Sequence, residues 1–351
     1  MKIVIIGGGI SSISLLCYFI REDNEWFQAH DWLILEKKER IGIGDIGNYK
    51  IRSNSVLPAF RSIIPTTCIQ LDPLLKKLLD NVGNDFAPLG LVSEMMSCVA
   101  KSILNQYSNV RAKTNSNVIA VDNNVVILEN EERIESDCIV IANGASQEIP
   151  TEYLHYKNVL TSTDVLSNNN SHDFTNKRVA IIGNSHSAWS VVWSLLQDYR
   201  KKFSSIDIYS RNKTRVFFRT THAAVLENYE YNDDDICSET NQIHRFGGLR
   251  GDSKQVWRNH RSGLYPNINH HICLTIPGDL SSKYDYVVVA YNYRRRRGII
   301  GSENCINFGF MSNIPLEAGE KSFRGSKDGI WLYSNDFAKI ISKKIMNKVL
   351  A

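Results

Sequence analysis

The sequence predicts an α/β protein with two parallel sheets, because one local pattern occurs twice in the chain. The first copy is a run of apolar residues at 2–6, a glycine turn at 7–9 and a helical stretch from Ile10. The second copy repeats the order of strand, turn and helix, starting at Arg178. A strand that feeds a helix through a glycine turn is typical of Rossmann-like, doubly wound dinucleotide-binding domains. We therefore expect two such domains, the second inserted into the first.

The composition suits two folded cores and gives no sign of a nucleic-acid partner. Of the 351 residues, 43% are hydrophobic and 22% are charged, and the net charge is only +4. A run of four arginines at 294–297 is interpreted as a solvated loop. The seven cysteines show no CxxC pair and no zinc-like spacing, so we expect neither a disulfide framework nor a metal site. No stretch approaches the roughly 18 apolar residues that span a bilayer, and we expect a cytoplasmic protein without a membrane partner.

The first copy has the residues that a dinucleotide turn requires. Gly7 makes the tight turn, Gly9 lets a pyrophosphate approach the backbone, and Ser12 is the small residue where helix packs on strand. The helix N-terminus adds unpaired N–H groups and a partial positive charge. The next apolar strand, at 32–35, ends in Glu36, a carboxylate placed to accept a ribose hydroxyl.

The second copy departs from the pattern at one position and favours a different nucleotide. Gly183 takes the first position and Ala188, after Ser187, the third. Ser185 stands where the second glycine belongs, so its side chain crowds the pyrophosphate. The following strand ends in a hydroxyl and two cations instead of an acid, which suits a 2′-phosphate and favours NADPH over NADH. These residues are Ser210, Arg211 and Lys213. The alternative is that the two cations are only a charged strand end.

Two further buried strands, at 138–142 and 286–290, each follow an acidic residue and end in a turn. The turns are Asn143-Gly144-Ala145 and Tyr291-Asn292-Tyr293. These junctions resemble the strand-plus-"ATG" junctions that link the FAD and NADPH domains of two-dinucleotide flavoproteins. The resemblance implies that Gly144 lies at a cofactor.

A third segment resembles the class B flavin-containing and N-hydroxylating monooxygenases. The glycine-rich residues 42–47 precede the segment 49–55, and these enzymes carry a similar glycine-rich segment before an asparagine-containing "TNT"-like turn beside the flavin. The turn at Gly183 is similar to their GxGQSA turn, with His186 in place of the glutamine. The resemblance implies FAD in the N-terminal domain, over residues 1–160 and 300–351, and NADPH in the inserted domain, over 161–299.

The resemblance also assigns roles to single residues. It implies that Asn54 is catalytic, beside the flavin ring and its oxygen adduct. It implies a lining of the FAD site by Glu36, Arg40, Gly42, Gly44 and Asp45. Related flavoproteins end in a strand, a short turn and a helix, which here correspond to 330–334, Asn335-Asp336 and 337–349. Asp336 either contacts the flavin or caps that helix.

The implied reaction is oxygenation of a small molecule with O2. NADPH reduces FAD, O2 adds to the reduced flavin, and the C4a-hydroperoxyflavin passes oxygen to an amine, an amino acid or a sulfur compound. Among the possible oxygenations, N-hydroxylation is favoured, followed by S-oxidation and Baeyer-Villiger insertion. The region 241–271 is rich in aromatic and cationic residues and is expected to be a substrate-facing excursion from the NADPH domain. The alternative is a surface excursion whose aromatics pack beneath it.

Two other functions stay open. One is a flavin-dependent NAD(P)H oxidoreductase or oxidase without oxygen transfer. The other is an FAD-binding protein whose degenerate second site no longer binds NADPH and whose role is not redox. The sequence does not name the substrate, and it is compatible with a homodimer.

Overall fold

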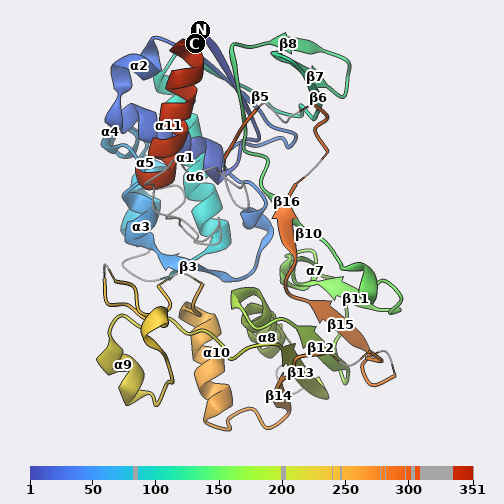
Figure 1. Ribbon diagram of the computed structural model, residues 1–351. Helices are drawn as coiled ribbons and strands as arrows, with labels where there is room; N and C mark the ends of the chain where they lie inside the picture. Colours follow the sequence, from blue (N-terminus) through green and yellow to red (C-terminus); the bar gives the residue numbers. More distant parts are fainter. Residues whose placement is uncertain are drawn as a thin grey trace. The chain divides into compact units, whose positions relative to one another are not determined.

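A computed structural model describes residues 1–81, 86–198, 203–238, 240–245, 247–276, 278–280, 282–296, 298–301, 305–308 and 335–350. The chain divides into two compact units. Unit 1 comprises Met1–Gly47, Ser55–Ser146 and Arg295–Ala351, and unit 2 comprises Asn48–Asn54 and Gln147–Arg294. In Figure 1 the blue helix α1 and the red helix α11 lie side by side, although they come from opposite ends of the chain. The second unit is therefore inserted into the first.

Unit 1 is built on a parallel sheet whose central strand is β1. The order is β17 (Ile306–Asn307), β9 (Cys138–Ile141), β1 (Lys2–Ile6), β2 (Asp31–Leu35) and β5 (Val110–Lys113). All four strand pairings are parallel. Side chains of β1 alternate between two cores, with Ile3 and Ile5 in one and Val4 and Ile6 in the other. A strand buried on both faces explains the continuous apolar run in the sequence.

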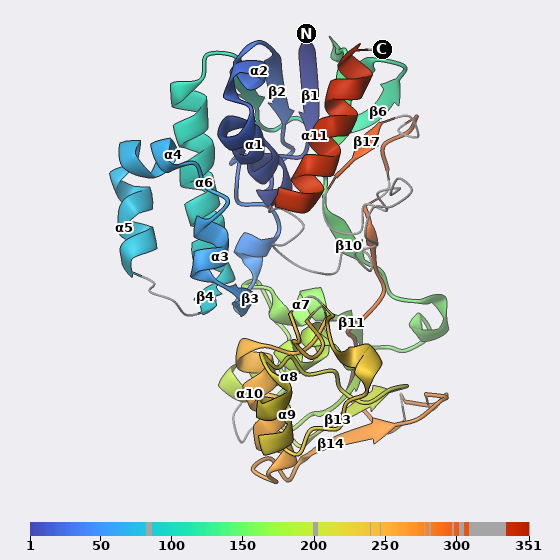
Figure 2. The ribbon, with the colours of Figure 1, turned by 60° about the vertical axis from the view of Figure 1, so that its left-hand side comes forward.

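Different elements cover the two faces of this sheet. The core around Ile3 and Ile5 includes residues of α1 (Ile10–Glu22), α6 (Leu89–Gln106) and α11 (Asn335–Leu350), seen together in Figure 2. The other core includes the antiparallel strands β6 (Val118–Asp122), β7 (Val125–Leu128) and β8 (Arg133–Glu135). The remaining elements of the first 90 residues are α2 (Asn24–Gln28), η1 (Ile46–Asn48), β3 (Arg52–Val56), α3 (Leu57–Arg61), α4 (Thr66–Leu71), α5 (Pro73–Asn81) and β4 (Phe86–Pro88). Helix α11 matches the helix expected at 337–349, whereas the strand expected at 330–334 lies outside the described residues.

Unit 2 repeats the design around β12. The order of its parallel sheet is β11 (Val159–Thr161), β15 (Tyr286–Val289), β12 (Arg178–Ile182), β13 (Ser205–Ser210) and β14 (Ile268–Ile272). Its helices are η2 (Thr151–Tyr153), α7 (Ser162–Leu166), α8 (His186–Asp198), α9 (Thr221–Leu226), η3 (Asp233–Asp235) and α10 (Gly251–Arg261). The short strands β10 (Ala145–Gln147) and β16 (Tyr293–Arg295), where the chain passes between the units, pair with each other. In both sheets the strand before the glycine turn is central, as the repeated pattern predicts.

The expectation of an excursion at 241–271 is wrong for most of that region. Helix α10 packs on α8, where the buried hydroxyls of Ser190 and Ser253 are 2.9 Å apart. Strand β14 pairs in parallel with β13 and completes the edge of the sheet. Much of the chain outside regular structure lies earlier instead, between β13 and α10. Connections between a strand and the next helix are usually short, so this long one made the order of β13, α10 and β14 hard to predict from the sequence.

Segment 48–54 groups with unit 2 although it lies in the N-terminal part of the chain. The Lys50 N–H donates to the carbonyl of Leu166 at 3.1 Å, and the Asn168 N–H donates to that of Asn48 at 2.7 Å. The Lys50 ammonium also pairs with Asp198 of α8 at 3.3 Å.

The helices of the described residues include none with the length and apolar character of a membrane span.

Candidate functional site

The two glycine turns are built with the same backbone hydrogen bonds. The Gly7 N–H donates to the carbonyl of Leu35 at 2.8 Å, and the Gly183 N–H donates to that of Tyr209 at 2.9 Å. On the other side of each central strand, an alanine N–H donates to the last strand carbonyl at 2.8 Å. These alanines are Ala142 after β9 and Ala290 after β15. The internal repeat seen in the sequence is therefore also a repeat in three dimensions.

The first glycine of each turn is required by a close backbone approach. Gly7 has φ +101°, and a Cβ there would lie 2.5 Å from the carbonyl oxygen of Ala142. Gly183 has φ +130°, and a Cβ there would lie 3.1 Å from that of Ala290. A side chain at either position would strain the backbone and push the neighbouring strand away.

The junctions after β9 and β15 share a left-handed residue at the same place. Gly144 has φ +76°, and Asn292, two residues after Ala290 as Gly144 is after Ala142, has φ +66°. Asparagine tolerates this conformation better than most other side chains. The change from glycine to asparagine therefore preserves the turn.

The turn after β1 leaves the N-terminus of α1 without a capping side chain. Gly9 is the N-cap residue, and a Cβ there would meet only the Cα of Gly44, at 3.5 Å. Uncapped N–H groups beside two glycines fit a pyrophosphate, which satisfies them and benefits from the helix dipole. Ser12 is fully buried and its hydroxyl donates to the carbonyl of Gly7, so it also holds the turn.

Glu36 lies at the end of β2 and braces this turn with both carboxylate oxygens. Oε2 accepts the Gly8 N–H at 2.6 Å and Oε1 accepts the Lys38 N–H at 2.8 Å. Each carboxylate oxygen has a second lone pair, so these bonds are compatible with accepting a ribose hydroxyl as well. The ribose contact itself stays a prediction.

The other residues assigned to the FAD site make protein contacts of their own. Arg40 forms a bidentate pair with Glu94 of α6, at 3.1 and 2.7 Å. The Gly42 N–H donates to the carbonyl of Gly8 at 2.6 Å, which fixes the glycine-rich segment to the turn. Asp45 pairs with Lys38 at 2.8 Å and with Arg296 at 2.9 Å. Burial raises the pKa of Asp45, but the hydrogen bond from Lys38 and the charge of Arg296 outweigh it and hold that pKa below its usual value.

The run of four arginines at 294–297 is not simply a solvated loop. Besides the pair of Arg296 with Asp45, Arg294 lies 3.7 Å from Glu148 and donates to the Asn292 side chain at 3.0 Å. Two of its four arginines therefore have structural partners within the chain.

Asn54 lies in strand β3 and not in the turn that the resemblance implies. It is half-buried between the buried Ser53 and Ser55, as alternation along a strand requires. Asn335 and Asp336 are the first residues of α11, and their side chains lie outside the described residues. The roles of Asn54 and Asp336 stay predictions.

The second turn starts α8 at His186, immediately after the exposed Ser185. Ala188 is fully buried at the third position, and Ser187 is half-buried. Burial, and then the charge of Arg250, lower the pKa of His186 to about 4, so its ring is neutral at pH 7. Its Nδ1 is buried and has no hydrogen-bond partner among the described residues. Sequence reasoning noted His186 only as a replacement for glutamine.

Asn184 connects this turn to the chain after β13, a role that sequence reasoning missed. Its Oδ1 accepts from the Trp189 indole at 3.0 Å and from the Thr214 hydroxyl at 2.6 Å. Its Nδ2 donates to the carbonyl of Asn212 at 2.7 Å. The sequence offered one signal for this role, which is that the residue directly after Gly183 carries an amide side chain able both to donate and to accept hydrogen bonds.

The three residues expected to hold a 2′-phosphate lie at the end of β13, but they differ in their contacts. Ser210 is buried, and its hydroxyl donates to the carbonyl of Asn212 at 2.9 Å and lies 2.8 Å from Nε2 of His270. Arg211 and Lys213 are exposed. Lys213 forms an ion pair with Glu230. The two exposed cations are thus accessible to an anion, whereas the Ser210 hydroxyl already makes hydrogen bonds within the protein.

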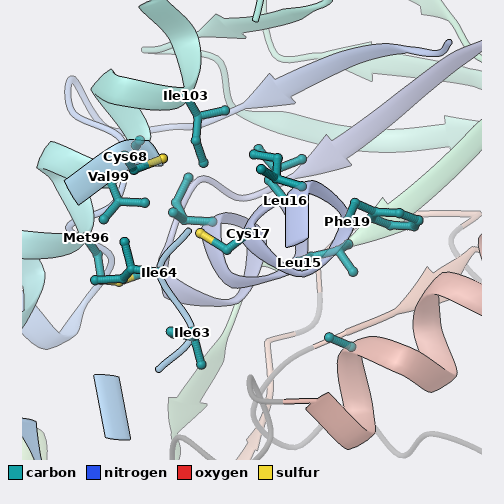
Figure 3. Close-up of a cluster of buried hydrophobic side chains, with 14 of the residues drawn as sticks. Leu15, Leu16, Cys17, Phe19, Ile63, Ile64, Cys68, Met96, Val99 and Ile103 are labelled. Atoms are coloured by element: carbon teal, nitrogen blue, oxygen red, sulfur yellow. The ribbon is translucent and has the colours of Figure 1, made fainter. Parts of the chain in front are cut away.

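All seven cysteines belong to the described residues, and none of them forms a disulfide. Four are buried, and Figure 3 shows Cys17 and Cys68 among apolar side chains such as Leu16 and Val99. Burial raises the pKa of Cys68 and of Cys138 to about 11. Such thiols are unreactive at neutral pH, because the thiolate is the nucleophile.

Comparison with known proteins shows the family. Residues 1–211 match the family described as pyridine nucleotide-disulphide oxidoreductase. The chain belongs to this family. It is therefore an oxidoreductase that uses FAD and a nicotinamide nucleotide, and the predicted cofactors, FAD and NADPH, agree with this family assignment.

Similar proteins cover most of the chain. A CMP-5′-(3-aminopropyl)phosphonate hydroxylase of Streptomyces rubellomurinus is 23% identical over 98% of this chain and 97% of its own. The ornithine hydroxylase of Pseudomonas aeruginosa has a TM-score of 0.54 at 17% identity, over 86% of this chain and 84% of that one. The FAD-bound cadaverine monooxygenase of Erwinia amylovora has a TM-score of 0.57 at 14% identity, over 84% and 78%. These likenesses confirm the predicted fold and the resemblance to flavin monooxygenases.

Proposed function

We propose that the protein is an FAD-dependent, NADPH-using monooxygenase that N-hydroxylates a small primary amine or amino acid. The observation that carries the proposal is a pair of matching dinucleotide turns in a chain without a reactive dithiol. A disulfide reductase passes electrons from flavin to two neighbouring cysteines. The sequence has no CxxC pair and four of the seven cysteines are buried, which argues against that acceptor. Because similar proteins are hydroxylases and monooxygenases, we infer that O2 receives the electrons instead, through a C4a-hydroperoxyflavin.

The names of similar proteins support an amine as the substrate. The Streptomyces relative is a hydroxylase of a compound with an aminopropyl group. Among solved structures of similar fold are enzymes of ornithine, cadaverine and lysine. All four compounds carry a primary amine on an alkyl chain. Cyclohexanone monooxygenase has a similar fold, with a TM-score of 0.55 at 11% identity, which makes Baeyer-Villiger insertion the second candidate.

We assign the cofactors to the two turns. FAD is held by the turn at Gly7 and Gly9, with Glu36 at its ribose. NADPH is held by the turn at Gly183 and the N-terminus of α8, with Arg211 and Lys213 at its 2′-phosphate. When bound, the flavin supplies the redox chemistry and the activation of O2. By the resemblance, Asn54 would lie beside the bound flavin, where its amide would serve as a hydrogen-bond donor.

Product analysis tests the amine assignment. Purified, FAD-loaded protein is given NADPH and O2 with a panel of diamines, basic amino acids and aminoalkylphosphonates, and with ketones and sulfides as controls. We expect at least one amine to accelerate NADPH oxidation, to lower peroxide release and to give a hydroxylamine. Lactone or sulfoxide formation would move the assignment to another oxygenation. Peroxide equal to the NADPH consumed with every compound would overturn it in favour of an oxidase.

A further inference from the structure

The side chain of Gln147 is the centre of a hydrogen-bond network in unit 2. Its Nε2 donates to the carbonyls of Val289 and Tyr291, at 2.7 and 2.9 Å. Its Oε1 accepts from the hydroxyl of Ser162 at 2.9 Å and from the N–H of Thr163 at 3.2 Å. Carbonyls can only accept, so the two ends of this amide are not interchangeable. Gln147 therefore ties the end of β10 to the chain after β15 and to the first turn of α7.

The two carbonyls belong to the junction that lies against the glycine turn of unit 2. Val289 and Tyr291 flank Ala290, whose N–H donates to the carbonyl of Ile182 at 2.8 Å. The carbonyl oxygen of Ala290 is also the atom that a Cβ at Gly183 would approach to 3.1 Å. An amide that binds both neighbours of Ala290 fixes this junction against the turn that we assign to NADPH.

The same network reaches the segment that carries Asn54. The Thr163 hydroxyl lies 3.3 Å from Oε1 of Gln147 and 3.3 Å from the hydroxyl of Tyr49. A hydroxyl has a single proton, and Thr163 donates its proton to Gln147, so Thr163 accepts from Tyr49. The hydrogen bonds therefore run without a break from the junction after β15 to Tyr49, five residues before Asn54.

Ion pairs hold this segment to two helices of unit 2. Lys50 pairs with Asp198, the last residue of α8, at 3.3 Å. Nε of Arg52 lies 4.0 Å from Asp252 in the first turn of α10. The N-terminal segment that groups with unit 2 ends at Asn54. The backbone that leads to Asn54 is therefore held by the unit that we assign to NADPH.

We propose that Gln147 and Tyr49 are positioning residues, which set the place of Asn54 from the junction beside the NADPH turn. The inference rests on the proposed function, because that function gives Asn54 its place beside the flavin. Loss of a bond in the network releases the segment without removing a group that touches a cofactor. Because spatial continuity alone does not establish coupling, the decisive quantity is the measured coupling between Tyr49 and Asn54.

Hydrogen exchange tests whether the network holds the segment, and it needs neither NADPH nor a substrate. Exchange is followed in the peptide that contains the Lys50 amide, in FAD-loaded wild type, Tyr49→Phe and Gln147→Met. We expect exchange there to be about threefold faster or more in both variants, because each loses hydrogen bonds. Tyr156→Phe is the matched control, since it removes a 2.8 Å bond to the carbonyl of Gly278. Unchanged exchange in Tyr49→Phe would overturn the proposal.

Peroxide release tests whether the network acts through Asn54. FAD-loaded protein is reduced with NADPH and mixed with O2 without substrate, and the rate of hydrogen peroxide release is measured. Tyr49→Phe should raise this rate by about two- to tenfold and leave the KM for NADPH unchanged. In the Asn54→Ala background the same substitution should have no further effect. Equal effects of Tyr49→Phe in both backgrounds, or a change in KM alone, would overturn the proposal.

The positioning role and the proposed function fail in different ways. If Asn54→Ala releases peroxide faster than the wild type but Tyr49→Phe does not, the proposed function stands and the positioning role is wrong. If the wild type releases peroxide as fast as every variant, the monooxygenase assignment fails, and hydrogen exchange decides whether the network holds the segment. Tyr49→Phe loses a single hydroxyl, so both tests remain decisive even if Gln147→Met does not fold.

Discussion

At the residue scale, the turn that we assign to FAD shows which side chains are replaceable and which are not. Gly7 cannot carry a Cβ, because the carbonyl oxygen of Ala142 occupies that space. Gly9 has room for one, since only the Cα of Gly44 is near, at 3.5 Å. The protein itself therefore has room for a small side chain at Gly9, so a loss of FAD after a substitution there reports on the ligand and not on the fold.

We predict that Gly9→Asp abolishes retention of FAD, whereas Gly9→Ala keeps most of it. The aspartate places a charge against the pyrophosphate, while the alanine methyl meets only ordinary van der Waals contact. The ratio of flavin absorbance to protein absorbance after purification measures the effect, and circular dichroism confirms folding. A Gly9→Asp protein that stays yellow after purification would show that FAD does not bind at this turn.

Arg211 gives a second prediction at this scale. Arg211→Ala should raise the KM for NADPH by about tenfold or more, the effect of losing a charge-assisted contact with the 2′-phosphate. The KM for NADH should change little, because NADH lacks that phosphate. Steady-state flavin reduction with both coenzymes measures this, and equal effects on both would rule out the 2′-phosphate role.

At the element scale, the strands and turns were predictable and some of their connections were not. The strands β1, β12, β9 and β15 are short apolar runs beside glycine or asparagine turns, so local sequence carries the signal. Helix α10 and strand β14 were interpreted as an excursion, because a long irregular segment separates them from β13. The contact of Asp45 with Arg296 joins residues far apart in the chain, and no local pattern predicts such a pair.

The contact between α8 and α10 is testable through its buried hydroxyl pair. Ser253→Ala leaves the Ser190 hydroxyl buried without this partner, and should lower the free energy of unfolding by about 1–2 kcal/mol. The double variant Ser190→Ala/Ser253→Ala should cost less than the sum of the two single variants, because no orphaned hydroxyl remains. Chemical denaturation measures all four proteins. Strict additivity would show that the hydroxyls do not interact.

At the scale of the whole molecule, half-buried histidines that stay neutral make stability depend on pH. The pKa of His270 is lowered to about 4, first by burial and then by His260 and His271. The unfolded chain takes up that proton near pH 6.5 and the folded chain does not. The stability that depends on the neutral His270 ring is therefore fully present above pH 6.5 and is lost as the pH falls toward 4, by an amount on the order of 1–3 kcal/mol because solvent screens this half-buried residue.

We accordingly predict that His270→Gln flattens the acid limb of the stability curve between pH 6.5 and 4. The glutamine keeps a hydrogen-bonding group near the Ser210 hydroxyl but does not titrate. The exposed His222 supplies the control variant, His222→Gln, which should leave the slope as it is. Urea midpoints measured across this pH range decide the matter, and parallel curves for His270→Gln and the wild type would contradict the account.

The two matching turns support an enzyme in which NADPH reduces FAD and O2 receives the electrons. Stopped-flow spectroscopy tests this most directly, with FAD-loaded protein reduced by NADPH without oxygen and then mixed with oxygenated buffer. We predict a transient C4a-hydroperoxyflavin band before oxidised FAD returns, and a shorter-lived band in Asn54→Ala. Direct return to oxidised FAD with stoichiometric peroxide, or no reduction by NADPH, would contradict the monooxygenase assignment.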